Sequence, residues 1–301
     1  MVWRRIKKSL SVLIIIICFY FIFRSLYFNW ASLKVANLKF CWEYLVLSYF
    51  FMFATLVLVA YTWKKNLAML NENISLTKAL QINALATLPK YAPGKVWGIA
   101  GKVYLANKEG ISAENCVITI TLETILYLLG GIILFLLTSV SQIKGHISLS
   151  YLLLIPVFLV IIYPKFFIKI TNYFLKLLKR PLINVIPNYL QILVLLLLYT
   201  LSWIFQGIGI FFLIKSFYPI GVKYLMLISG LHAFSWVVGF LSIITPAGLG
   251  VKEGVFSYFL SFILPTSIAA ISAILVRIWG TIGEILYFFV YSTKIKKYLR
   301  Q

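Results

Sequence analysis

The sequence contains no aspartate, and its seven acidic residues are all glutamates. It has two histidines and three cysteines, too few for the usual ligand clusters of a metal site or for a disulfide framework. It has no P-loop and no Ser-His-Asp or Cys-His arrangement. We therefore predict no metal, no ATP or other cofactor, and no enzymatic activity within this chain.

Charge of either sign is scarce. Only 12% of the residues are charged and 62% are hydrophobic, whereas soluble domains carry about 25% charged residues. The net charge is +21, which in a soluble protein would suggest nucleic acid as a partner. Here the basic residues flank apolar runs, where they orient a membrane protein and meet anionic lipid headgroups. We expect membrane lipids as partners and no nucleic acid.

Apolar runs suited to crossing a bilayer, which takes about 20 residues, recur along the whole chain. Tyrosine and tryptophan cluster near their ends, as in the aromatic belts of membrane proteins. The fold class is therefore all-α, a polytopic transmembrane helical bundle that forms a single integral membrane domain over residues 1–301. The predicted spans are 10–23, 42–63, 117–139, 149–163, 189–212 and 267–291.

Two further apolar stretches are interrupted by proline and glycine. Each is followed by a glycine-rich piece and then by a span with an embedded charge, so the pattern repeats over about 42–140 and 189–291. Lipid cannot satisfy the backbone groups that such a break exposes, so the breaks must be buried in protein or line a wet cavity. Paired breaks in two halves point to a transport site between inverted repeats. The break residues are Pro93, Gly94, Gly98 and Gly101, and Pro246, Gly248 and Gly250.

The distribution of basic residues gives a topology. If both interrupted stretches are re-entrant hairpins, six full spans remain, and the segments on one side carry twenty Lys and Arg against six on the other. The positive-inside rule then places both termini in the cytoplasm and the protein in the cytoplasmic (inner) membrane. An alternative with eight crossings, in which both arms of the second hairpin span the bilayer, leaves the termini on the same side.

Ionisable residues inside spans are costly and are functional candidates. Glu123 lies in the third span, and Arg277 and Glu284 share one face of the last. The alternative is structural: Arg277 pairs with Glu123 or Glu284 and locks helices together. The hairpins add Lys102, Lys252 and Glu253 as candidates for substrate binding.

The glycines of the two hairpins have their own interpretations. A helix starting after Gly250 would direct its N-terminal amides at a phosphate or carboxylate, or would be a plain helix start. Gly248, Gly250 and Gly254 permit close backbone approach, and Gly94, Gly98 and Gly101 fall near helical spacing, which suits small-residue helix packing. A histidine on an apolar stretch, His232, is expected to be a hydrogen-bonded core residue.

The stretch ITPAGLGVKEG at 244–254, followed by AAISAILVR at 269–277, resembles the transmembrane region of the lysylphosphatidylglycerol synthase family, also called flippase-like membrane proteins. The stretch PGKVWGIAGKVY at 93–104, followed by TLE at 121–123, resembles the matching block of the first half. In the family pattern an arginine is usual where Lys102 stands, and Thr124 occupies a place often held by arginine. The resemblance therefore implies that substrate choice can differ in this chain.

Larger members carry a soluble aminoacyl-transferase domain, and their membrane region is thought to move the modified lipid across the membrane. This chain is expected to be a stand-alone translocating unit, because no such domain follows before Gln301. The predicted function is translocation of a phospholipid or a lipid-linked glycan. The alternatives are a secondary transporter of a small solute or ion, a membrane-embedded transferase, and a membrane partner of an envelope lipid or glycan transferase. An envelope-biosynthesis enzyme and a second copy of the chain are left open as partners.

Overall fold

The computed structural model describes residues 39–91, 97–139, 149–177, 188–242, 248 and 250–292, and every regular element in these ranges is a helix. Five of them are long and apolar enough to cross a membrane. They are α2 (Trp42–Ala68), α5 (Ala113–Ser139), α8 (Tyr189–Lys215), the 3-10 turn η3 with α9 (Val222–Leu241), and α11 (Thr266–Ser292). The prediction of a polytopic helical membrane bundle is confirmed, while the predicted span at 10–23 lies outside the described residues.

The first hairpin consists of α3 (Leu76–Thr87), the 3-10 turn η1 (Leu88–Tyr91) and α4 (Trp97–Lys108). Each of the two α-helices has 12 residues, or about 18 Å, which is well short of the ~30 Å hydrocarbon layer. The Glu72 carboxylate, before the hairpin, accepts hydrogen bonds from the Ser112 N–H and the Asn115 side-chain amide, after it. The chain therefore returns to the end of the bundle from which it left.

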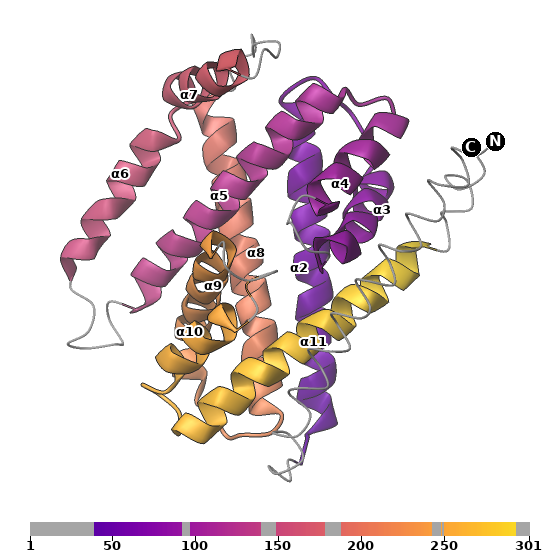
Figure 1. Cartoon of the computed structure of the whole chain (residues 1–301). Coiled ribbons are helices and arrows are strands. Elements are labelled where there is room, and N and C mark those ends of the chain that lie inside the picture. The colour runs from indigo at the N-terminus through magenta and orange to yellow at the C-terminus, as the bar shows by residue number, and fades with distance from the viewer. Residues whose placement is uncertain are drawn as a thin grey trace.

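The second hairpin consists of α9 (Leu225–Leu241) and α10 (Val251–Leu260). With its preceding turn, α9 is long enough to cross, but α10 has 10 residues and covers only about 15 Å. Ile220 before the hairpin and Leu264 after it belong to one apolar cluster. Both ends of the hairpin lie at one end of the bundle (Figure 1). Because α10 is too short to cross the bilayer, the structure favours a re-entrant second hairpin over two full crossings.

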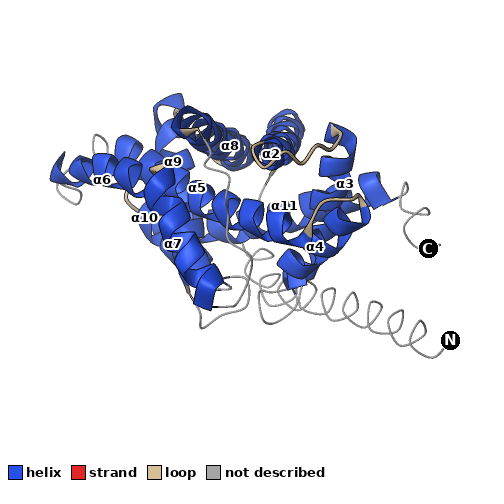
Figure 2. Cartoon of the chain, turned by 90° about the horizontal axis from the view of Figure 1, so that it is seen from above, coloured by secondary structure: helices blue, strands red, loops and turns tan. Residues whose placement is uncertain are grey.

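The long helices and the hairpins form a closed circuit of contacts (Figures 1 and 2). α2 packs along α8, and each hairpin is held between α5 and α11. In the first hairpin α4 packs on α5 and α3 on α11, whereas in the second α9 packs on α5 and α10 on α11. The element order of long helix, two hairpin arms and long helix thus occurs twice along the chain.

Polar side chains and small residues hold this bundle together, as expected where lipid provides no hydrophobic drive for helix association. Hydrogen bonds join helices far apart in sequence: Asn66 Nδ2 donates to the Thr119 carbonyl, and Tyr287 Oη donates to the Leu80 carbonyl. Gly207 on α8 faces α9, where an added Cβ would lie 1.9 Å from Ser229 Oγ. These contacts fix the spans that carry the candidate site.

The region between the two repeats differs from the prediction. The predicted span at 149–163 consists of a five-residue 3-10 turn, η2 (Leu149–Leu153), and the eight-residue α6 (Leu154–Ile161), so the described helix is shorter than a full span. The predicted basic loop after it contains a helix, α7 (Pro164–Leu177), which lies across one end of the bundle (Figures 1 and 2). Its first residue is proline, whose fixed φ and missing N–H suit the first position of a helix.

Candidate functional site

The first buried ion pair joins α4 to α5. Lys102 Nζ donates to Glu123 Oε2 at 2.6 Å, and the two side chains are 9% and 15% exposed. The same ammonium lies 4.2 Å from the ring centre of Trp63 on α2, which is fully buried. The carboxylate and the aromatic face together replace the water that the ammonium loses. Three helices therefore meet at one cation.

The second buried ion pair joins α10 to α11. Arg277 Nη1 donates to Glu253 Oε1 at 3.2 Å, and the other carboxylate oxygen of Glu253 accepts a 2.8 Å hydrogen bond from the Gly250 N–H. That N–H belongs to the start of α10, where the helix dipole favours negative charge. The place that the sequence suggested for a phosphate or carboxylate of a ligand thus holds the chain's own carboxylate.

The two pairs occupy matching places in the two repeats with their charges reversed. Each joins the second arm of a hairpin to the long helix that follows. In the first hairpin the arm carries the cation and the long helix the anion, whereas in the second the arm carries the anion. Both pairs hold a short hairpin arm against a membrane span, and we call them the ion-pair latches.

The remaining candidates lie nearby on the same helices. Lys252, half-buried on α10, packs against α9, where its Cβ would be 3.0 Å from a Cβ added at Gly239. Glu284 is half-buried on α11, two turns after Arg277. Tyr127, one turn after Glu123, is within electrostatic range of both Glu123 and Glu284. The structure thus brings Lys102 to Glu123 and Arg277 to Glu253.

The glycines of the second break differ in what they require. Gly248 has a φ of +69°, and an added Cβ would lie 2.8 Å from the Gly239 carbonyl oxygen, so a side chain is excluded there. Gly250 has a φ of +81° but no neighbour near an added Cβ. At Gly254 an added Cβ would meet nothing within 4 Å, so the predicted close approach does not occur there. Pro246 lies outside the described residues.

Fewer residues of the first break are described. Pro93 and Gly94 lie outside the described residues, and Gly98 and Gly101 lie on α4. The nearest atom to a Cβ added at Gly101 is Pro89 Cγ at 4.0 Å, an ordinary van der Waals distance. Gly101 therefore faces the 3-10 turn η1 at an ordinary contact distance.

An aromatic cluster that the sequence did not reveal lies beside the latches. Tyr127 contacts Trp203 and Trp236 with ring centres 4.2 and 5.2 Å apart, and Trp203 Nε1 donates to the Tyr127 carbonyl. His232 is only 1% exposed and lies between Trp203 and Phe256, at 5.9 and 5.5 Å. Neither of its ring nitrogens has a hydrogen-bond partner among the described residues, so the expected hydrogen-bonded core histidine is buried but not bonded. No sequence motif marks this cluster, because its rings come from four helices.

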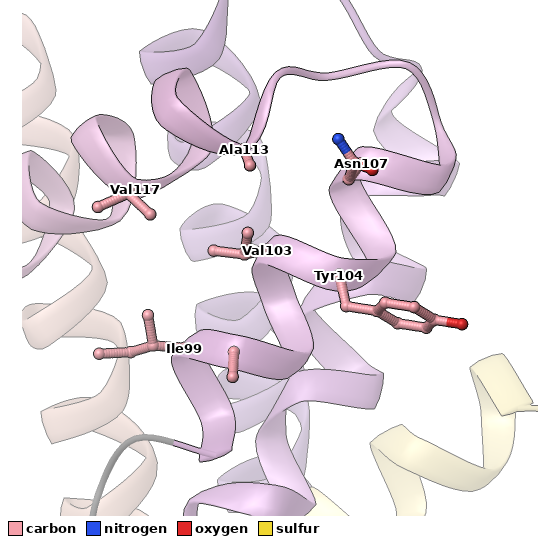
Figure 3. Close-up of a pocket in the computed structure, with 7 residues that line it drawn as sticks. Ile99, Val103, Tyr104, Asn107, Ala113 and Val117 are labelled. Atoms are coloured by element: carbon pink, nitrogen blue, oxygen red, sulfur yellow. The ribbon is translucent and has the colours of Figure 1, made fainter. Parts of the chain in front are cut away.

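An apolar groove lies between α4 and the start of α5 (Figure 3). Its volume is about 460 Å³. Its lining is apolar apart from the Asn107 amide and the Tyr104 hydroxyl. Lys102 lies between the lining residues Ala100 and Val103 in sequence, but its side chain is directed to Glu123 and not into the groove. The lining residues are Ile99, Ala100, Val103, Tyr104, Asn107, Ala113 and Val117.

Paired hairpins, each joined to a membrane span by a buried ion pair, belong to a multi-pass helical membrane protein. The family follows from the sequence. The chain belongs to the family of the lysylphosphatidylglycerol synthase TM region, whose sequence model matches residues 9–286. The family resemblance seen in the two hairpin motifs is thereby confirmed. Neither a curated protein nor a solved structure shows significant similarity to the chain. Family membership places it among membrane proteins of lipid-related biosynthesis or transport.

Proposed function

We propose that the protein translocates a lipid with an anionic headgroup, a phospholipid or a lipid-linked glycan, across the cytoplasmic membrane. The observation that carries this proposal is the position of the Glu253 carboxylate. It is bound by the Arg277 guanidinium and by the N-terminal N–H of α10, next to the break in the second hairpin. A guanidinium and a helix N-terminus are the groups that bind phosphate in proteins.

In this proposal a lipid phosphate replaces Glu253 on Arg277. Because Glu253 is on the hairpin arm and Arg277 on the long helix, the exchange opens the latch and frees α10 from α11. The cost of separating the buried pair is offset by the new charge-assisted hydrogen bonds to phosphate. Lys102 is the second cation available to a headgroup, with Glu123 balancing its charge when the headgroup leaves.

The apolar groove beside α4 supports the same proposal. It adjoins the hairpin arm that carries Lys102 and is lined mainly by apolar side chains, which suit an acyl chain or an isoprenoid tail (Figure 3). The tail can therefore stay in contact with apolar surface while the headgroup meets the latch. We propose, further, that the chain acts without catalysis, that both ends face the cytoplasm, and that any transferase that makes the cargo is a separate partner.

The experiment is leaflet exchange in liposomes. The purified protein is reconstituted with fluorescent phospholipids of anionic and zwitterionic headgroups, and exchange is followed by chemical quenching of the outer leaflet. We expect faster exchange of the anionic lipid and at least a tenfold loss of that rate in Arg277→Gln. The matched control is Lys223→Gln, an exposed cation before α9, which should keep the rate.

Two outcomes would contradict the proposal. Exchange no faster than in protein-free liposomes for every headgroup would exclude lipid translocation by this chain. Proton-coupled uptake of a small solute that disappears in Glu123→Gln would instead support a secondary transporter.

A further inference from the structure

The helix α7 has three distinct faces. Pro164 and Ile168 are buried against the bundle, Ile168 in the apolar cluster around Leu126 and Leu195. Three exposed lysines, Lys165, Lys169 and Lys176, follow at i, i+4 and i+11 and fall within about 40° of one another around the axis. α7 contains no acidic residue, so this stripe has one sign of charge.

The third face is apolar and exposed. Phe166, Tyr173 and Leu177 are 56%, 63% and 63% exposed, and their spacing of i, i+7 and i+11 places them on one stripe next to the lysines. Exposed aromatic and aliphatic side chains at this density are unfavourable in water but suit the boundary between headgroups and acyl chains. The bundle covers a different face of α7, so this stripe is available to lipid.

The position of α7 matches this pattern. It lies across the end of the bundle where α8 begins, and in the chain it stands between α6 and α8 (Figures 1 and 2). α8 is an apolar helix long enough to cross the membrane, and its beginning beside α7 marks the level of the headgroups (Figure 1). A helix at that level with adjacent apolar and lysine stripes lies in the plane of the interface.

We propose that α7 is an interfacial platform that binds the headgroups of anionic phospholipids in the leaflet it contacts. The lysines spread over about 16 Å of helix, so they meet separate headgroups and not a single phosphate. The charge of the lysines and the depth of the helix indicate which lipid binds. Lysine ammonium groups beside an apolar stripe attract acidic lipids and discriminate little among zwitterionic lipids. This surface is separate from the ion-pair latches and does not depend on translocation.

The test compares spin-labelled phosphatidylglycerol with spin-labelled phosphatidylcholine bound to the protein in liposomes, measured by electron spin resonance. One variant replaces the three α7 lysines by glutamine. Its matched control makes the same change in net charge at three exposed lysines on other elements, Lys65, Lys108 and Lys223.

We expect the wild type to prefer phosphatidylglycerol, and the α7 variant to lose that preference by roughly fivefold or more, since each of the three lysines removed contributes up to about fivefold near an anionic surface. The control variant should keep it. In 0.5 M salt, where the Debye length is only about 4 Å, the wild-type preference should weaken. An equal preference in wild type and α7 variant, or an equal loss in the control, would overturn the proposal.

Orientation is tested separately by cysteine labelling. In a background where Cys18, Cys41 and Cys116 are replaced, single cysteines are introduced at Lys169 and Tyr173 and exposed to a water-soluble maleimide in nanodiscs. We expect position 169 to react at least several-fold faster than position 173. Similar rates at the two positions would show that α7 is not embedded at the interface. Because neither assay measures exchange between leaflets, failure here leaves the proposed translocation to be judged by its own experiment.

Discussion

Breaking the Lys102–Glu123 pair should destabilise the protein by different amounts according to which partner is removed. Removing one member of a buried ion pair costs about 3–5 kcal/mol, because the other charge stays buried without compensation. Lys102→Gln leaves the Glu123 carboxylate in that position. Glu123→Gln leaves the ammonium over the Trp63 ring, 4.2 Å from its centre, and such a buried cation–π contact is worth about 2 kcal/mol.

We therefore expect Lys102→Gln to lower the free energy of unfolding by about 4 kcal/mol and Glu123→Gln by about 2 kcal/mol. In the double variant no buried charge is left unpaired, so its cost should fall below the sum of the two by at least about 1 kcal/mol. The control is Lys65→Gln, an exposed lysine near the Tyr61 ring, which should change stability by less than about 0.5 kcal/mol.

The assay is reversible unfolding by sodium dodecyl sulfate in mixed micelles, followed by circular dichroism, for the four variants and the wild type. Additive costs in the double variant would refute the reasoning, because they would show that the two side chains do not act on each other. A larger loss in Glu123→Gln than in Lys102→Gln would refute the role given to Trp63. Either result can be read without knowing the substrate.

Other contacts give three further predictions. His232→Phe should leave stability unchanged or raise it by about 1 kcal/mol in the same unfolding assay, because it removes two buried nitrogens that have no hydrogen-bond partner among the described residues; a large loss would show that the imidazole makes a necessary contact. Gly248→Ala should lower the free energy of unfolding by at least about 2 kcal/mol, because its φ is positive and an added Cβ would meet the Gly239 carbonyl. Gly254→Ala should leave stability unchanged or raise it, and equal effects of the two substitutions would contradict this geometry. Glu72→Gln should speed amide hydrogen exchange at the start of α5 and lower stability by about 1 kcal/mol, and unchanged exchange there would show that this carboxylate does not close the first hairpin.

Much of the bundle could be predicted from the sequence because lipid imposes simple rules. Long apolar runs gave the spans at 42–63, 117–139, 189–212 and 267–291, which the structure places in α2, α5, α8 and α11. The helix α7 was missed because a basic segment of this length is typical of a loop, although its lysines recur at helical spacing. Hydropathy alone does not distinguish an interfacial helix from a connecting loop.

The candidate site was predicted in its residues but not in its pairing. Costly charges inside spans identified Glu123 and Arg277, and the broken segments added Lys102 and Glu253. Which cation meets which carboxylate depends on how a hairpin arm lies against the next span, and this is set by packing between residues more than twenty positions apart. Trp63 and the cluster around Tyr127 left no pattern in the sequence, because the rings of the cluster come from four helices and Trp63 from a fifth.

The reversed charges of the two latches give the proposed lipid opposite effects in the two halves. A phosphate bound to Arg277 binds to the long helix and competes with Glu253, so it releases the arm α10. A phosphate bound to Lys102 binds to the arm itself and competes with Glu123 for the ammonium, so the proposed lipid would be attached to α4 and not to the long helix. In the proposed mechanism, a headgroup therefore separates the second hairpin from its long helix but binds to the arm of the first hairpin. Two inverted repeats with identical charges would respond alike at both ends, whereas the reversal makes the two sides of the membrane inequivalent for the same cargo.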